Sequence, residues 1–458
     1  MTMPQRLSSD YVATGGSRLA PELSPFAGHA DASRGRLTRV ALATMIGSGI
    51  EAFDFLMFGT AAALVFNKSF FPNFDPTAAA LAAFATFATG LFARPIGGLL
   101  FGHFGDRLGR KTMLMLSLMG MGFATVLIGV TPSYQMIGLW AAVLLVVLRI
   151  VQGLSFGGEM GGAMIMAVEH APDRHKSFFG SLPQMGAPIG LLLSTSAFAA
   201  VSGLPEQAFA SWGWRLPFIA SIVLVIIGYF VRRNVDESPE FVEFERKQKV
   251  VRLPALEVVR RHSKPLLLTI GGKLAEVTLF YFIVVFMLSY AIRQQIITRS
   301  DGLEAIMIGA AVQLAAIPIC GWLGDRIGQK LLYCIGGGLL AVLAVPALAA
   351  IEGGSAIGLK IAIVAGLGLI YPLMYGPQAS LFSVQFPARL RCSGLSLGIQ
   401  IAAAIGGGLA PIVAAALLEV SGSLVPIGVY LAGLGVIAAA CALLARSPAA
   451  IGRTAMQP

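Results

Sequence analysis

Charged residues are scarce in this sequence. Asp, Glu, Lys and Arg together make up 12% of the 458 residues, while 56% are apolar and the mean hydropathy is +0.78. A soluble domain has about a quarter of its residues charged, so this chain cannot cover a water-facing surface of its size. The composition excludes an ordinary soluble protein and predicts an integral membrane protein.

Cysteine is also rare, and the spacing of the four thiols matches no metal site. Buried thiols usually act as small hydrophobic side chains. No nucleophile–base or metal constellation is recognisable, which argues against an enzyme, and we expect no cofactor. Residues 1–38 lack the apolar run of a signal peptide, so we predict a disordered cytoplasmic tail there.

Long apolar runs are what the sequence has instead. A helix that crosses a bilayer needs about 20 mostly apolar residues. Strand-type alternation is absent, so helices must satisfy the backbone within the membrane. Twelve runs qualify, and they are 40–64, 79–104, 112–130, 137–168, 178–202, 213–231, 266–290, 303–323, 331–350, 356–384, 392–418 and 424–445. We therefore predict an all-α membrane fold with twelve transmembrane helices.

A ten-residue motif, Gly-x-x-Gly-Asp-Arg-x-Gly-x-Lys, occurs twice. Gly102–Lys111 follows the second span, and Gly321–Lys330 follows the eighth, 219 residues later. A repeat at this period predicts two six-helix halves in the same orientation, with a solute site between them near mid-membrane. The expected organisation is a tail at 1–38, a bundle at 39–231, a basic linker at 232–264, a bundle at 265–446 and a tail at 447–458.

The motif predicts a tight cytoplasmic turn. Its glycines permit positive φ, its aspartate can cap a neighbouring helix N-terminus, and its basic residues can pair with acids or lipid headgroups. We expect both copies to act as latches that hold an outward-open state. The gating candidates are Gly102, Gly105, Asp106, Arg107, Gly109, Arg110, Glu159, Asp325, Arg326 and Gly328.

Lys and Arg are unevenly distributed along the chain. With the N-terminus in the cytoplasm, 25 of the 33 lie on the cytoplasmic side and 5 on the other; the remaining three, Arg94, Arg149 and Lys273, lie within spans. This bias follows the positive-inside rule and places both termini in the cytoplasm. The formal charge of +10 therefore indicates loops that face lipid headgroups. We expect no nucleic-acid partner, since no aromatic stacking platform accompanies the basic linker.

Ionisable residues inside a membrane are costly and usually functional. Glu51 and Asp54 lie three residues apart in the first span, and Arg149 lies at matching depth in the fourth. Two carboxylates facing one arginine form a proton switch if their pairing changes during transport. The alternative is a static salt bridge that fixes the packing of the two spans. We favour proton coupling through these three residues, because intramembrane acids often mark proton relays.

The seventh span carries a second charged pair, Lys273 and Glu276, at the repeat-related position. Lys273 could meet a solute carboxylate, or it could merely neutralise Glu276. Arg94 in the second span could attract an anion from the cavity wall, or it could counter Glu159. Both alternatives stay open at this level.

Polar and aromatic residues on the expected cavity-facing helices complete the substrate-site candidates. They are Gln152, Gln184, Tyr281, Tyr371, Tyr375, Gln378 and Gln400. The tyrosines of the tenth span are favoured because nearby prolines open its backbone. Gly153 and Gly157, four residues apart, predict a close helix–helix packing face.

Several segments resemble the metabolite:proton symporters of the major facilitator superfamily. Glu51–Gly59, Gly102–Lys111 and Arg149–Glu159 carry the resemblance, which runs from about residue 40 to 445. Within that family, Ala63–Asn67 and Phe70–Pro72 are most similar to the shikimate permease branch.

The resemblance implies proton symport, uptake and a bacterial inner membrane. The solutes of the family include α-ketoglutarate, citrate, shikimate and aromatic acids, as well as proline and betaine. We therefore expect a monomeric carrier that imports a small organic acid or zwitterion, with the proton as coupling ion. Export of a drug or metabolite by proton antiport is the alternative. Ala52 and Met160 stand where the family often has aromatic residues, a departure that would reshape the cavity.

Overall fold

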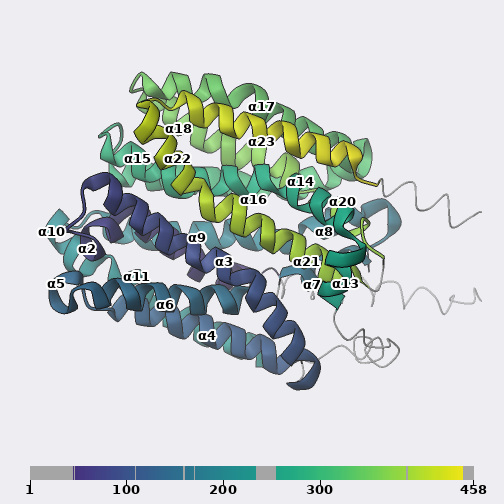
Figure 1. Ribbon diagram of the computed structural model, residues 1–458, viewed down its shortest axis with the longest axis horizontal. Helices are drawn as coiled ribbons and strands as arrows, with labels where there is room; N and C mark the ends of the chain where they lie inside the picture. The colour runs from purple at the N-terminus through teal and green to yellow at the C-terminus, as the bar shows by residue number, and fades with distance from the viewer. Residues whose placement is uncertain are drawn as a thin grey trace, which may run out of the picture. The chain divides into compact units, whose positions relative to one another are not determined.

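The computed structural model (Figure 1) describes residues 45, 47–108, 110–157, 160–169, 171–233, 254–387 and 390–446. The side chains of residues 102–112 and of a few other helical positions are outside this description. Residues 41–458 form one compact unit. The regular elements of the described ranges are all helical, as the absence of strand-type alternation predicts.

The helices of the N-terminal half form six spans, and the first is a continuous helix over Gly47–Phe70. The elements in chain order are η1 (Ala62–Phe66), α2 (Asn67–Phe70), α3 (Pro76–Leu108), α4 (Arg110–Val130), α5 (Tyr134–Ile137), α6 (Leu139–Phe156), α7 (Met160–Glu169), η2 (Asp173–His175), α8 (Lys176–Ser181), η3 (Pro183–Met185), α9 (Gly186–Ser202), α10 (Glu206–Ala208), η4 (Phe209–Gly213) and α11 (Arg215–Arg233).

The C-terminal half repeats this plan after a short amphipathic helix. Its elements are α13 (Pro254–Arg261), α14 (Ser263–Tyr281), η5 (Phe282–Met287), α15 (Leu288–Arg293), α16 (Arg299–Ile327), α17 (Gln329–Glu352), α18 (Ala356–Ala365), η6 (Gly366–Ile370), α19 (Tyr371–Tyr375), α20 (Gln378–Ser383), α21 (Arg391–Ala402), η8 (Ala403–Gly408), α22 (Leu409–Ser421) and α23 (Val425–Leu444).

Each of the twelve predicted spans has a counterpart in the described ranges. Ten helices are long and apolar enough to cross a membrane. An eleventh span is bent by 41° between η4 and α11, and a shorter apolar helix, Met115–Val130, supplies the twelfth. The predicted fourth span, 137–168, differs in detail because α6 ends at Phe156 and α7 begins at Met160.

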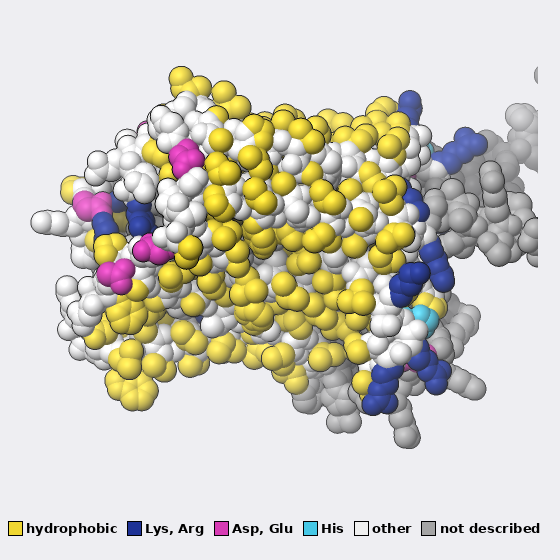
Figure 2. Space-filling model, turned by 45° about the horizontal axis from the view of Figure 1, so that its top comes forward, with side chains coloured by type: hydrophobic (Ala, Val, Ile, Leu, Met, Phe, Trp, Pro, Cys, Tyr) yellow, Lys and Arg dark blue, Asp and Glu magenta, His cyan; other side chains and the backbone are white. Residues whose placement is uncertain are grey.

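The flank of the molecule is apolar and its two ends are polar. Large hydrophobic side chains such as Phe123, Trp140 and Val342 are 66%, 73% and 70% exposed. Figure 2 shows such side chains covering the flank, with Lys and Arg gathered at the end where α13 lies. We call this end the basic end and the other the opposite end. An apolar belt between polar ends is the surface that a bilayer requires.

The two halves share a local irregularity in their first spans. The π-helical segments η1 and η5 begin at Ala62 and Phe282, at matching positions of the repeat. Such segments are rare and often lie at functional sites. Figure 1 shows the N-terminal helices, purple to blue, packed against the C-terminal ones, green to yellow. The halves meet where α3 packs against η8 and α22, and where α16 packs against α8 and α9.

Some predictions fall partly or wholly outside the described residues. These are the tails at 1–38 and 447–458, most of the linker at 232–264, and the gating side chains Gly102, Gly105, Asp106, Arg107, Gly109, Arg110 and Glu159. The described end of the linker is helical, since α13 occupies Pro254–Arg261. Backbone is described through Leu108, and it shows that the first motif continues α3 for most of its length instead of forming a turn at Gly102.

Glycines allow α3 and α6 to touch backbone to backbone. A Cβ atom built on Gly153 would lie 2.0 Å from the carbonyl oxygen of Gly90, and one on Gly157 would lie 2.0 Å from that of Arg94. A Cβ on Gly97 would meet the carbonyl of Leu154 at the same distance. The predicted packing face at Gly153 and Gly157 is therefore confirmed. This close approach carries Arg94 and Arg149, on the same two helices, into the interior.

Substitution at this contact tests the packing. Gly153→Ala must separate α3 from α6, and we expect overpacking to cost about 1–3 kcal/mol. The midpoint of thermal unfolding of the purified protein in detergent should fall. Gly338→Ala is the matched control, because a Cβ on this glycine of α17 meets nothing within 4 Å. Equal midpoints for the two variants would contradict the assigned contact.

Candidate functional site

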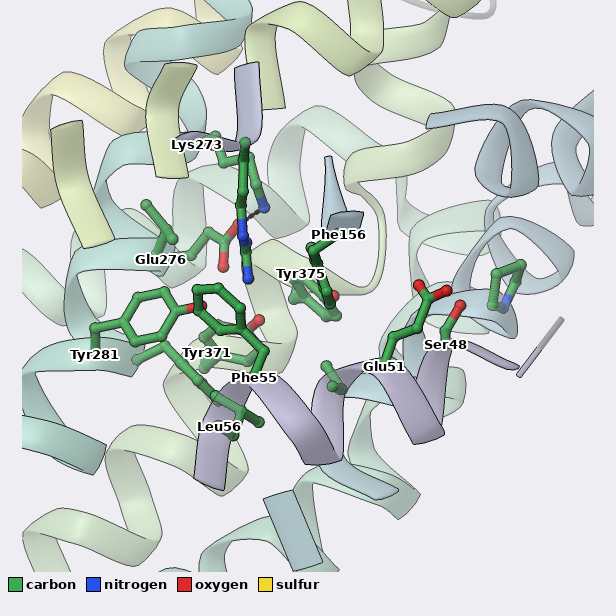
Figure 3. Close-up of a pocket in the computed structure, with 16 residues that line it drawn as sticks. Ser48, Glu51, Phe55, Leu56, Phe156, Lys273, Glu276, Tyr281, Tyr371 and Tyr375 are labelled. Atoms are coloured by element: carbon green, nitrogen blue, oxygen red, sulfur yellow. Dashed lines mark hydrogen bonds and ion pairs between the residues drawn. The ribbon is translucent and has the colours of Figure 1, made fainter. Parts of the chain in front are cut away.

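A cavity lies between the two halves and is lined by both. Its volume is about 70 Å³, room for about five water molecules if each needs about 15 Å³. The N-terminal half contributes residues from spans 1, 2, 4 and 5, and the C-terminal half contributes residues from spans 7 and 10. Figure 3 shows Glu51 and Ser48 of span 1 on one side, and Lys273, Glu276, Tyr281 and Tyr371 on the other.

Arg94 is the cation that the N-terminal half presents to the cavity. Its guanidinium carbon lies 3.8 Å from the ring centre of Phe55 and 3.9 Å from that of Phe156, so the group is held between two aromatic faces. The side chains of Glu51 and Tyr281 lie close enough to interact electrostatically with this guanidinium. Its Nε atom has no hydrogen-bond partner among the described residues. Of the two predicted alternatives, the cavity position is the one that Arg94 occupies; Glu159 is outside the described residues.

Lys273 is the cation that the C-terminal half presents. Its ammonium forms an ion pair with Glu276 on the next turn of α14 and donates to Oε1 of Gln378 at 3.1 Å. It also lies 5.2 Å from the ring centre of Tyr375. One oxygen of Glu276, Oε2, has no hydrogen-bond partner among the described side chains. The pair therefore retains an acceptor atom beside the cavity.

Aromatic rings form the remaining wall on the C-terminal side. Tyr371 and Tyr375 lie 4.7 Å apart between ring centres, and Phe280 packs 5.4 Å from Tyr371. Tyr281 reaches across to the N-terminal half, where its ring lies 5.3 Å from that of Phe87. Rings at such distances attract one another and offer their faces to a cation. The cavity thus combines two cations, two acids and an aromatic wall.

Two glutamines join the halves next to the cavity. The side-chain amide of Gln378 in α20 donates to the side-chain oxygen of Gln184 in η3. Gln184 donates in turn to the carbonyl of Gly180 at 3.2 Å. Because Gln378 also holds Lys273, a chain of hydrogen bonds runs from the charged pair into the N-terminal half. Neither glutamine lines the cavity directly, so their predicted contact with solute is replaced by a bridging position.

Asp54 does not form the ion pair with Arg149 that we predicted. It is fully buried, and neither of its oxygens has a hydrogen-bond partner among the described residues. Thr125 of α4 lies beside it, but that hydroxyl donates to the carbonyl of Met121. Asp54 is also absent from the cavity wall, whereas Glu51 lines it. The predicted carboxylate pair is thus divided between two environments.

Arg149 is nevertheless linked through Gln152 to Thr125, the side chain beside Asp54. It donates to Oε1 of Gln152 at 3.0 Å, and the amide of Gln152 donates to the hydroxyl of Thr125 at 2.8 Å. Arg149 also donates to the carbonyl of Phe55 at 3.3 Å, and its guanidinium lies 3.7 Å from the centre of that ring. Gln152 is therefore a link in a buried chain and not a cavity residue.

The depth match between spans 1 and 4 is correct, because Arg149 contacts the residue that follows Asp54. The expected ion pair is absent because of how span 1 is rotated about its axis. The helix face toward the cavity carries Ser48, Glu51, Ala52 and Phe55, which are spaced three or four residues apart. Asp54 falls outside this face and points toward α4.

At the basic end, the second motif copy binds the other half of the chain. Asp325 in α16 accepts hydrogen bonds from the backbone nitrogens of Ser177 at 2.8 Å and Phe178 at 2.9 Å. Its carboxylate thereby caps the N-terminus of α8. Gly328 has φ of +99° at the turn that follows, as the motif predicts. The guanidinium carbon of Arg326 lies 4.3 Å from the ring centre of Trp322.

Two further contacts close this end. Arg391 forms an ion pair with Glu169 at 2.7 Å, and Gln400 donates to the carbonyl of Gly157 at 3.3 Å. Gln400 was predicted to bind solute, but it lies at this closure and not in the cavity wall. The depth of Gln400 in the membrane is compatible with the cavity wall and with the closure. The rotation of its helix about the axis decides between them.

Six predicted substrate residues line the cavity together with Glu51, and the rest of its wall was not among the candidates. The six are Arg94, Lys273, Glu276, Tyr281, Tyr371 and Tyr375. The wall residues that were not predicted include Ser48, Phe55, Phe156 and Phe280. The helix face through Glu51 could have identified Ser48 and Phe55 from the sequence. Nothing in the sequence distinguishes Phe156 or Phe280 from other apolar residues of their spans.

Comparison with known sequences relates this chain to membrane carriers. The sequence model of the Major Facilitator Superfamily matches residues 44–411. The Shikimate transporter of Escherichia coli (strain K12) is 39% identical over 416 residues, which covers 90% of this chain and 95% of the relative. The Glycine betaine/proline/ectoine/pipecolic acid transporter OusA of Dickeya dadantii (strain 3937) is 36% identical and covers 88% and 82%.

Solved structures share the fold. The partially occluded inward-open conformation of the xylose transporter XylE from E. coli has a TM-score of 0.69 at 18% identity, and covers 88% of this chain and 96% of that one. A second structure, of the proton:xylose symporter XylE bound to 6-bromo-6-deoxy-D-glucose, has a TM-score of 0.68 at 17% identity, with coverage of 90% and 95%.

The contact at Asp325 predicts a measurable change in closure. Asp325→Ala removes both caps of α8, and loss of a capping side chain costs about 0.5–2 kcal/mol. We expect the basic end to open more often, so that a cysteine placed at Ser181, which is buried against Gly321, reacts about two- to thirtyfold faster with a thiol reagent. Glu419→Ala, an exposed acid on α22, is the control. An unchanged rate in Asp325→Ala would remove its assigned role.

Proposed function

The chain belongs to the Major Facilitator Superfamily, and on that premise we propose that it is a proton-coupled importer of a small organic acid or zwitterion. Its family and its relatives are transporters and not enzymes. One observation carries the choice of solute: Arg94 and Lys273, from opposite halves, line the same cavity. A solute held between the halves is the arrangement that alternating access requires.

The charges of the cavity favour a molecule that carries a carboxylate. Arg94 has an unsatisfied Nε atom, and an arginine binds a carboxylate through charge-assisted hydrogen bonds. Lys273 can exchange its bond to Gln378 for one to a solute oxygen. The tyrosine wall and the acids Glu51 and Glu276 suit the positive group of a zwitterion as well. The shikimate and betaine carriers among the relatives support both classes of solute.

Asp54 is the group that we propose to carry the proton. An ionised carboxylate buried without a cation or a donor is far less stable than the neutral acid. Asp54 is in that position, and its neighbour Thr125 begins a chain of hydrogen bonds through Gln152 to the buried cation Arg149. Rearrangement of this chain as the halves rock would bring Asp54 and Arg149 together and release the proton. Glu51, at the cavity wall, then provides a second acid on the route between proton site and solute.

Orientation follows from the distribution of charge. We propose that the basic end faces the cytoplasm of a bacterium, with both termini on that side, since 25 of the 33 Lys and Arg residues belong to it. The opposite end then receives the solute. The bacterial relatives, one of them an inner-membrane transport protein, support this membrane as the location.

The proton assignment predicts a separation of two activities. In energised cells or proteoliposomes, Asp54→Asn should reduce accumulation of the transported acid to its equilibrium level, because an amide cannot carry the proton. Exchange of labelled for unlabelled solute across the membrane, which needs no net proton movement, should continue. Shikimate and glycine betaine are the probes to try in turn. Glu419→Gln, an exposed acid, serves as the control.

Two results would count against this assignment. Full accumulation by Asp54→Asn would exclude Asp54 as the proton carrier. Acidification of the outside medium on addition of solute, where symport requires alkalinisation, would indicate antiport and overturn the proposed direction.

The solute assignment predicts a stabilising ligand. A carboxylate solute at a hundredfold its dissociation constant should stabilise the purified protein by about 2.7 kcal/mol and raise its unfolding temperature. In the double variant Lys273→Gln/Glu276→Gln, which leaves no unpaired buried charge, the affinity for the acid should fall about 10- to 100-fold, because one charge-assisted hydrogen bond is lost. Lys264→Gln removes an exposed cation at the basic end and should bind as the unmodified protein does. Equal affinities in both variants would contradict a role for Lys273.

A further inference from the structure

A second and larger cavity opens at the opposite end, between the two halves. Its volume is about 690 Å³, which is within the range of small-molecule sites. Six ionisable side chains line it: Lys68, Glu206, Arg293, Arg299, Asp301 and Lys360. Four cations against two acids give the wall a net charge of +2. Figure 2 shows acidic and basic side chains side by side at this end.

This concentration of cations is unusual for its side of the membrane. The sequence places 5 of its 33 Lys and Arg residues at the opposite end. Four of the five line this single cavity. The fifth, Arg215, is committed to the backbone, where it donates to the carbonyls of Gly129 at 3.1 Å and Thr131. A cavity whose wall has a net positive charge raises the local concentration of anions.

A carboxylate already occupies part of this wall. Glu206, from the N-terminal half, forms ion pairs with Lys68 at 3.0 Å and with Arg299 of the C-terminal half. Arg299 is held in place by the ring of Phe209, 3.7 Å away. Glu206 itself is 59% exposed, so it can leave these partners for water. The ion pairs of Glu206 therefore show how the cations of this cavity bind a carboxylate.

Arg293 is a third cation of the cavity wall. Arg293 ends α15, is exposed, and forms no ion pair with any carboxylate of the described residues. Lys360, by contrast, pairs with Asp301 at 2.7 Å. Arg293 and the pair Lys68–Arg299 therefore supply two places for the oxygens of an anion within one cavity.

We propose that this cavity is an entry site for small carboxylate anions, in which the incoming carboxylate replaces Glu206 on Arg299. The proposal rests on the proposed function, because it supplies that carrier with its anionic solute. Replacement breaks the ion pair between the halves and leaves the hydrogen bond between Ser202 and Ser300, at 3.1 Å, as a cross-half contact at this end. Binding at the entry site thus favours opening of the path to the central cavity.

The charge of the entry site can be measured without transport. A cysteine at Ala356, which lines the cavity and is partly exposed, is labelled in the full-length protein from the opposite end. Membrane-impermeant methanethiosulfonates carrying a sulfonate or a trimethylammonium group are compared, each normalised to its rate with free cysteine. We expect the anionic reagent to react about tenfold faster at low salt, and the preference to shrink at 1 M salt, where the Debye length is about 3 Å.

A charge series sharpens the test. Arg293→Gln should lower the preference and Glu206→Gln should raise it, because they change the net charge to +1 and +3. Lys264→Gln, an equal loss of charge at the basic end, should leave it unchanged. Shikimate or benzoate in the medium should lower the labelling rate of the anionic reagent when the cavity wall is otherwise unchanged. The rate should fall further in Glu206→Gln, because the carboxylate of Glu206 no longer competes with the added anion.

The outcomes separate this site from the carrier function. Equal rates for the two reagents, or a series in the wrong order, would overturn the entry site even in a protein that imports acids. The expected series in a protein that neither accumulates nor exchanges shikimate, benzoate or another carboxylate would support the anion site and overturn the proposed function.

Discussion

Arg94 and Lys273 line one cavity from opposite halves of the chain, and the cost of leaving a cation unpaired in an apolar interior governs much of what surrounds them. Arg94 is held between two phenylalanine rings, and Lys273 is bound to Glu276 and Gln378. Each arrangement stabilises the charge while leaving polar atoms beside the cavity. We propose that a solute with a carboxylate completes both sets of interactions.

Reciprocal acids close the two ends of the path. At the basic end, Asp325 of the C-terminal half caps α8 of the N-terminal half. At the opposite end, Glu206 of the N-terminal half holds Arg299 of the C-terminal half. Each contact joins one side chain to partners on the other half, so each can break without unfolding a helix. Two such closures around a central cavity give alternating access a physical basis: opening one end costs a few interactions and leaves the other intact.

The sequence predicted the spans well, because a helix that crosses a bilayer must present about 20 apolar residues in a row. It also identified six residues of the cavity wall, since ionisable and tyrosine side chains stand out in such spans. It failed where rotation about a helix axis decides the outcome. Gln152 and Gln400 have the right depth but face Thr125 and Gly157, and Asp54 points toward α4 while Glu51 faces the cavity.

What the sequence determined by itself is therefore the helical membrane fold, its two repeated halves, and the depth of each buried charge. These depend on composition, periodicity and counting along one chain. Only the tertiary structure decided which side chains meet: that Arg149 is linked through Gln152 to Thr125 beside Asp54, and that four distant cations gather in one cavity at the opposite end. Such contacts depend on how neighbouring helices are rotated and how closely their glycines let them pack, and neither quantity is local to any one segment.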